Sequence, residues 1–176
     1  VTRPPFGDCA SSTSPPMPYL SDNDKLQFLQ EGYLVLPDVI SPEMIAETRD
    51  ALWAGIRADR DNPATWINAE PRMPVTPEHP AMQAVVNDSP VFGIAEELAG
   101  PGTLRPCGAE PALIYPSGKD DWVLPPEGHL DGYYMPSNGV PFGTVDRFML
   151  AVTIYVDDVE HRGAGFIVYP RSHLAA

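Results

Sequence analysis

Residues 152–173, which read VTIYVDDVEHRGAGFIVYPRSH, decide the predicted fold. Two runs rich in β-branched and aromatic residues, 152–156 and 165–169, flank an acidic turn that contains glycine. Side chains of these types favour strands, and the polar residues between them favour a reversal of the chain. We therefore expect a β-hairpin at this end of the chain.

Similar short runs occupy the rest of the second half, separated by Gly, Pro and Asp. They comprise residues 112–115, 123–124, 128–135 and 148–156. Helix signals come first along the chain and strand signals follow, an order typical of α+β proteins. The sequence predicts a sheet or barrel built mainly from the second half.

Two helix starts are visible in the first third of the sequence. Ser21 with Asp24 resembles a capping box, and the apolar stripe that follows ends at Gly32, a natural residue for the left-handed position after a helix. Residues 41–43, Ser-Pro-Glu, provide an N-cap, a proline at the first helical position and an acid in the first turn. This second helix is expected to run to about Ala58.

The remaining first half divides into a loop, a further helix and an arm. Residues 59–80 are polar and interrupted by proline, which predicts a long loop. The Ser-Pro pair at 89–90 starts another helix, which Gly100 closes. Residues 1–20 are rich in proline and small polar side chains, which predicts an extended arm. We expect a single domain over residues 21–176.

Composition excludes several classes of protein. The chain of 176 residues has 11 Lys and Arg against 24 Asp and Glu, a formal net charge of −13, and it has no basic cluster. Nucleic acid and anionic membrane are therefore not expected as partners. Its two cysteines, Cys9 and Cys107, are interpreted as free thiols, and cytoplasmic localisation is the default expectation. The sequence leaves the oligomeric state open.

His129-Leu130-Asp131 is the motif with the clearest chemical meaning. Alternate residues of a strand share one face, so an imidazole and a carboxylate at this spacing can converge on one cation. Two histidines and one carboxylate with open coordination positions are typical of non-haem Fe(II) oxygenases. The alternative is a structural histidine at a strand edge, hydrogen-bonded to a nearby acid.

Three stretches in the same order resemble the phytanoyl-CoA dioxygenase family. Residues 28–41, FLQEGYLVLPDVIS, are similar to its opening; His129-Leu130-Asp131 resembles its first two iron ligands; residues 152–173 are similar to its later strand, acidic turn and hairpin. The resemblance implies an α+β fold with N-terminal helices and a double-stranded β-helix, or jelly roll. It also implies Fe(II) as cofactor and 2-oxoglutarate as cosubstrate.

The expected activity follows from that resemblance. Members of the family hydroxylate small organic molecules while 2-oxoglutarate is decarboxylated to succinate and CO2. A carboxylate at Asp131 favours hydroxylase over halogenase chemistry. An inward-facing Tyr115 or Thr153 is predicted to hydrogen-bond 2-oxoglutarate, because the side chains of strands alternate between the two faces of a barrel wall.

The chain also departs from the family pattern. Arg171 stands where the family usually has glycine. The family's distal iron-binding histidine, and the arginine that pairs with 2-oxoglutarate, lie beyond the position of His173. We therefore expect a jelly roll that is incomplete at its C-terminal end, with the third metal ligand absent. His173 is the substitute candidate for that ligand, although the resemblance places it in a structural turn.

The sequence is also compatible with two other interpretations of the function. The chain could be a non-catalytic jelly-roll binding protein, because a site with two ligands and no clamping arginine should hold iron and cosubstrate poorly. It could instead be a cupin-like metal dioxygenase that uses His129, Asp131 and His173 without 2-oxoglutarate.

Overall fold

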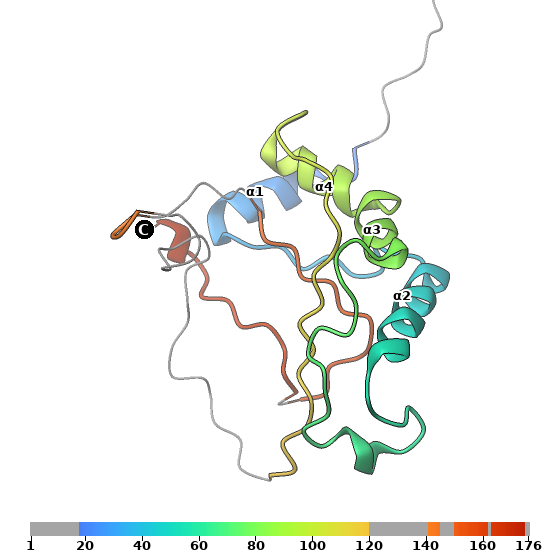
Figure 1. Ribbon diagram of the computed structural model, residues 1–176. Coiled ribbons are helices and arrows are strands. Elements are labelled where there is room, and N and C mark those ends of the chain that lie inside the picture. Colours follow the sequence, from blue (N-terminus) through green and yellow to red (C-terminus); the bar gives the residue numbers. More distant parts are fainter. Residues whose placement is uncertain (1–17, 120–140, 145–149, 162, 175–176) are drawn as a thin grey trace, which may run out of the picture.

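A computed structural model describes residues 18–119, 141–144, 150–161 and 163–174 (Figure 1). The longer helices are α1 (Asp22–Glu31), α2 (Pro42–Gly55), α3 (Pro80–Asn87) and α4 (Pro90–Ala99). Two short 3-10 helices, η1 (Pro63–Trp66) and η2 (Ser172–Leu174), complete the set. The described remainder consists of turns and extended segments. None of the described helices has the length and apolar character needed to cross a membrane.

The helices begin where the sequence predicts because serine side chains cap their first turns. Ser21 forms the expected capping box with Asp24 at the start of α1. Ser41 Oγ accepts the amide N–H of Met44 at 3.2 Å, and Ser89 Oγ accepts that of Val91 at 3.2 Å. Each of these bonds satisfies one of the backbone donors that a helix leaves unpaired at its N-terminus. The prediction of these three helices is confirmed; α2 ends three residues earlier than expected.

Helix α3 was not predicted from the sequence. Pro80 occupies its first turn, and the Nδ1 atom of His79 accepts the amide N–H of Ala81 at 3.2 Å. The helix therefore starts at the end of the expected loop, with a histidine in the role that Ser, Thr, Asp or Asn usually fills. Because none of the usual N-cap residue types directly precedes Pro80, no clear start signal marks this helix in the sequence.

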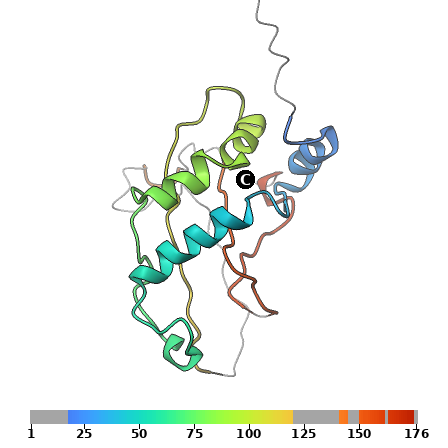
Figure 2. The same cartoon turned by 90° about the vertical axis from the view of Figure 1, so that its right-hand side faces the viewer.

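The core of the described part of the chain lies between α2, α3 and α4. Helix α3 packs against both of the others (Figure 2). Met82 and Val85 of α3 are 2% and 1% exposed, and the two neighbouring helices contribute further buried apolar residues. These residues are Leu52, Val91 and Ala95. Full burial of a Met or Val side chain is worth about 1.5–3 kcal/mol, so this three-helix contact is the main source of stability visible here.

The jelly-roll prediction is wrong for the residues that the structure describes, since none of them forms a β-strand. The runs 150–156 and 165–169 are extended but make no ladder of backbone hydrogen bonds with each other or with their described neighbours. The predicted runs 123–124 and 128–135 lie outside the described residues. Strand propensity requires a hydrogen-bonded partner to become a sheet, and the described part of the chain provides none.

Only isolated bonds join the extended segments. The amide of Asn68 donates to Pro116 O at 2.8 Å, and the amide of Leu113 donates to Arg72 O at 2.9 Å. Residues 68–72 and 113–116 therefore run side by side in opposite directions below the helices (Figure 1). This pairing fixes one wall of the cleft described next.

Candidate functional site

The two predicted metal ligands, His129 and Asp131, lie outside the described residues. Among the residues that the structure does describe, no group of three or more His, Cys, Asp or Glu side chains is arranged to hold a metal ion. The described part of the chain therefore supplies no iron site by itself, and the metal-site prediction depends on the sequence motif.

His173, the substitute third ligand, is engaged elsewhere. Its Nε2 atom lies 3.0 Å from Leu29 O, close to the end of α1. A carbonyl oxygen only accepts, so Nε2 carries the proton and donates it. A nitrogen that carries this proton has no lone pair for a metal, and the other ring nitrogen, Nδ1, lies against Gly32. In this structure both nitrogens of His173 are therefore engaged at the end of α1.

The two residues predicted to bind 2-oxoglutarate lie in different environments. Tyr115 is half-buried, and its hydroxyl donates to Pro71 O at 2.8 Å. Burial raises the pKa of the Tyr115 phenol above its ordinary value, which keeps it a neutral hydrogen-bond donor. Thr153 is exposed on the extended run 150–156. Neither position tests the predicted role, which stays a prediction.

Tyr115 contributes to a cleft of about 180 Å³. The cleft lies between α2, Trp66 of η1, and two extended segments, residues 113–116 and 156–157. Its lining is largely apolar and includes Leu52 and Trp53 of α2. An apolar cavity of about 150 Å³ holds one benzene ring, so this cleft has space for a ligand of about that size.

Two tryptophans form the aromatic part of this wall. The ring centroids of Trp53 and Trp66 are 5.6 Å apart and their planes meet at 51°, within the range that favours aromatic pairs. The indole N–H of Trp66 donates to Asp59 O at 2.8 Å, which fixes the ring. The guanidinium carbon of Arg60 lies 6.0 Å from the centre of the Trp53 ring. Sequence reasoning treated residues 59–80 as a loop and did not foresee this pair.

Arg49 is the charged residue of α2 in this lining, and its guanidinium is already occupied. Its Nε and Nη2 atoms donate to Val156 O at 3.0 and 2.6 Å, and Nε also lies 3.0 Å from the Asp157 carboxylate. Arg49 therefore ties α2 to the extended run that ends at Asp157. Since the Tyr115 hydroxyl is bound to Pro71 O, the cleft favours an apolar ligand over a charged one.

Comparisons with protein-family models, with curated proteins and with solved structures gave no match for this chain.

Proposed function

We propose that this chain contributes His129 and Asp131 to an Fe(II)- and 2-oxoglutarate-dependent oxygenase centre that hydroxylates a small organic molecule. The observation that carries the proposal is the His-x-Asp motif, placed between two stretches that resemble the phytanoyl-CoA dioxygenase family in the same order. The proposal concerns these residues and their chemistry, and it does not require the jelly-roll fold.

Residues 28–41, the first of these two stretches, support the proposal in part. Helix α1 ends at Glu31, and Gly32 adopts a left-handed conformation with φ of 84°. An extended link then leads to Ser41, which caps α2. The family resemblance implies a helix, a Gly-Tyr pair, a short strand and the next helix; the structure has the two helices and the Gly-Tyr pair in this order, and residues 33–40 form no strand.

His173 is left out of this proposed centre because its Nε2 proton is donated to Leu29 O and its Nδ1 atom lies against Gly32. The position of His173 also argues against the cupin-like dioxygenase, since that interpretation needs His173 as the third ligand. When bound, Fe(II) and 2-oxoglutarate would allow O2 to oxidise the substrate, with one oxygen atom entering the substrate as a hydroxyl and the other entering succinate. His129 and Asp131 would hold the metal through one imidazole nitrogen and one carboxylate oxygen.

The test is metal binding by the purified chain, followed by turnover. Co(II), a spectroscopic substitute for Fe(II), should bind with one-to-one stoichiometry and lose affinity in His129→Ala and Asp131→Ala. His161→Ala and Asp158→Ala, which alter a histidine and an aspartate in the acidic turn, are the matched controls and should bind as the unmodified chain does. Equal binding by all five proteins would refute the assignment.

Turnover separates catalysis from mere metal binding. Fe(II)- and O2-dependent release of succinate and CO2 from 2-oxoglutarate by this chain would support the oxygenase and would overturn the expectation that the third ligand and the clamping arginine are absent. Stoichiometric Co(II) binding that needs His129 and Asp131, without decarboxylation, would leave the metal site standing and favour the non-catalytic binding protein.

A second function, non-catalytic binding of a small molecule, is favoured by the cleft beside Trp53 and Trp66. Its size and apolar lining select an uncharged molecule with a single ring. Toluene is the probe: it should shift the indole N–H resonances of these two tryptophans saturably. Ile56→Phe, which narrows the cleft, should abolish the shift, whereas Leu29→Phe on the exposed face of α1 should leave it unchanged. A linear, unsaturable shift would contradict this function.

A further inference from the structure

The C-terminal end of the described chain returns to α1, the first helix. The backbone N–H of Arg171 donates to Glu31 O at 2.9 Å, and the Arg171 guanidinium lies 3.2 Å from the Glu31 carboxylate. The His173 imidazole donates to Leu29 O at 3.0 Å. Three polar contacts therefore join residues that are about 140 positions apart in the sequence.

These contacts occupy the backbone groups that α1 leaves unpaired at its end. The last four carbonyls of an α-helix have no partner within the helix. Here Phe28 O accepts the N–H of Gly32, while Leu29 O and Glu31 O accept protons from His173 and Arg171. The returning segment thus pairs two of the four carbonyls at the end of α1.

Gly32 makes the close approach possible. A Cβ atom at this position would overlap the His173 ring, and the backbone there has a φ of 84°, which side chains tolerate poorly. Gly32, the residue that follows α1, therefore also provides the space that the imidazole ring occupies.

Within the described part of the chain, no buried apolar side chain belongs to the returning segment. Residues 163–174 are exposed, including Tyr169 and Leu174, which are 57% and 67% exposed. Arg171 also has a φ of 66°, a left-handed conformation that a non-glycine residue adopts only at a cost. Opening this contact breaks solvent-exposed polar bonds and relieves that strain, without exposing any buried core.

We propose that residues 171–174 form a releasable strap: they close on the C-terminus of α1 through Glu31, Leu29 and Gly32, and open while α2, α3 and α4 stay folded. Segments with few buried apolar contacts are the ones that open locally in native proteins. Closed, the strap keeps the His173 imidazole from other partners. Open, it releases that imidazole and the Arg171-Ser172 bond together.

Hydrogen exchange of the unmodified chain tests local opening directly. The amide of Arg171 should exchange at a rate that is nearly independent of urea, because little surface is exposed when the strap opens. The amide of Val85 in α3 should exchange at a rate that rises steeply with urea. A shared urea dependence would mean that the strap opens only when the whole protein unfolds, which overturns the proposal.

Limited trypsin digestion tests the residues that hold the strap. Glu31→Gln and His173→Ala should each speed cleavage after Arg171 by roughly two- to tenfold, the range that the loss of one hydrogen bond gives. Cleavage after Arg60, which lies between α2 and η1, should not change. His173→Gln keeps a donor near the same place and should restore the slower cleavage.

Glu47→Gln, an exposed acid of α2, and His161→Ala are the matched controls, and both should be cleaved after Arg171 like the unmodified chain. Thermal midpoints of the two controls should agree with that of the unmodified chain within about 1 °C, and those of the strap variants should fall by no more than about 5 °C. Unchanged cleavage after Arg171 in both strap variants would contradict the proposal, and so would an equal rise after Arg60. These outcomes are independent of metal binding, so the strap and the proposed oxygenase centre fail separately.

Discussion

The α2–α4 region and the segment 150–174 have similar shares of apolar residues but opposite environments. Helices α2, α3 and α4 bury Leu52, Met82 and Val85 among themselves. Large apolar side chains of the extended segment remain exposed: Val152, Tyr155, Phe166, Ile167, Val168 and Tyr169. A helix satisfies its backbone locally, whereas an extended segment needs a neighbouring strand to do so. The difference shows that apolar content alone does not produce a core.

The largest expected effect comes from shortening a core side chain of α3. Met82→Ala should lower the free energy of unfolding by about 2–5 kcal/mol, because it leaves a cavity between the three helices. Phe166→Ala removes a larger side chain that is 59% exposed and should change it by less than about 0.5 kcal/mol. Urea denaturation of both variants measures the contrast. Similar losses for the two would mean that the extended segment carries as much of the core as the helices do.

The next largest effect concerns the cap between α3 and α4. Ser89 Oγ accepts the N–H of Val91 and donates to Val85 O at 2.7 Å, so one hydroxyl joins the end of α3 to the start of α4. Ser89→Ala should cost about 1–2 kcal/mol. Ser117→Ala, in an extended segment where Oγ accepts the N–H of Lys119, should cost less than about 0.5 kcal/mol. An equal cost at the two serines would remove the distinction between the regions.

These caps also explain how much of the fold the sequence could predict. Ser21, Ser41 and Ser89 act on amides two or three positions away, so a local pattern was enough to place α1, α2 and α4. The capping residue of α3 is His79, which the sequence does not mark as a helix start. The prediction of strands was wrong for a different reason. The residue types in 152–156 indicate a preference for strand conformation, but strand pairing depends on residues far away in the sequence.

The candidate site also has a part that could be predicted from a local pattern and a part that could not. The His129-Leu130-Asp131 motif is local and visible in the sequence, although its geometry lies outside the described residues. The cleft forms only when Trp53, Trp66 and residues 113–116 come together in the fold. Trp53 and Trp66 belong to different elements, and no sequence pattern connects the two positions. The contact of His173 with Leu29 spans 144 positions, so no local pattern predicted its partner.

A substitution inside α2 is expected to raise the free energy of unfolding, by less than the two substitutions above lower it. Thr48 is 3% exposed, and its Oγ1 atom has no hydrogen-bond partner among the described residues. A buried hydroxyl without a partner opposes folding, so Thr48→Val should raise the free energy of unfolding by up to about 1 kcal/mol. Thr153→Val, on the exposed run, should have almost no effect. A loss of stability in Thr48→Val would show that this hydroxyl is satisfied in solution.

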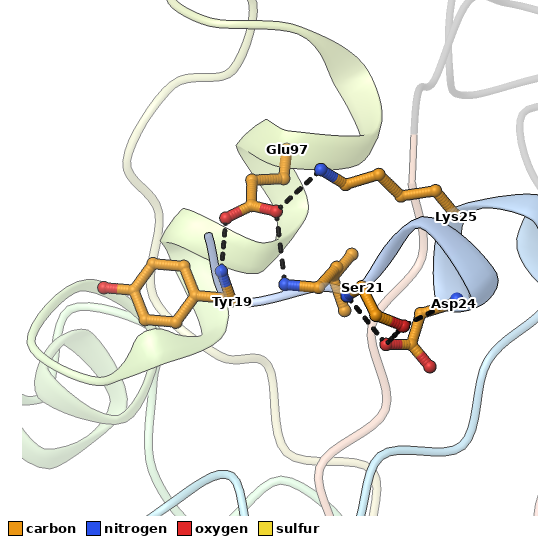
Figure 3. Close-up of polar contacts among 6 residues, drawn as sticks. Tyr19, Ser21, Asp24, Lys25 and Glu97 are labelled. Atoms are coloured by element: carbon orange, nitrogen blue, oxygen red, sulfur yellow. Dashed lines mark hydrogen bonds and ion pairs between the residues drawn. The ribbon is translucent and has the colours of Figure 1, made fainter. Parts of the chain in front are cut away.

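The smallest expected effect is a pH dependence at the contact that joins α1 to α4. Glu97 of α4 accepts the N–H of Tyr19 at 2.6 Å and of Leu20 at 3.2 Å, and its carboxylate lies 3.2 Å from Lys25 Nζ (Figure 3). The Tyr19 N–H has the largest effect and holds the pKa of the Glu97 carboxyl below its ordinary value; burial, the second-largest effect, raises it, and Lys25 and Leu20 each lower it by less.

The sign of the pH dependence follows from this lowered pKa. The unfolded chain binds a proton at Glu97 near pH 4.3, before the folded chain does. The stabilisation by Glu97 is therefore complete well above that pH, and it is lost as the pH falls through the lowered pKa of the folded state. Glu97→Gln should reduce the urea midpoint at pH 7, and its difference from the unmodified chain should shrink steadily below about pH 5.

The variant isolates this contact because other acids with lowered pKa values, such as Asp24 and Glu78, are present in both proteins and cancel in the difference. Asp157→Asn is the matched change in the extended region, where the carboxylate is 60% exposed beside Arg49. Exposed ion pairs contribute little, so its urea midpoint should stay close to that of the unmodified chain at every pH. A Glu97→Gln difference that stays constant down to pH 3 would show that the carboxylate is not what joins α4 to the start of α1. The helical region would then be held by its apolar contacts alone, and the contrast with the extended segment would depend entirely on burial.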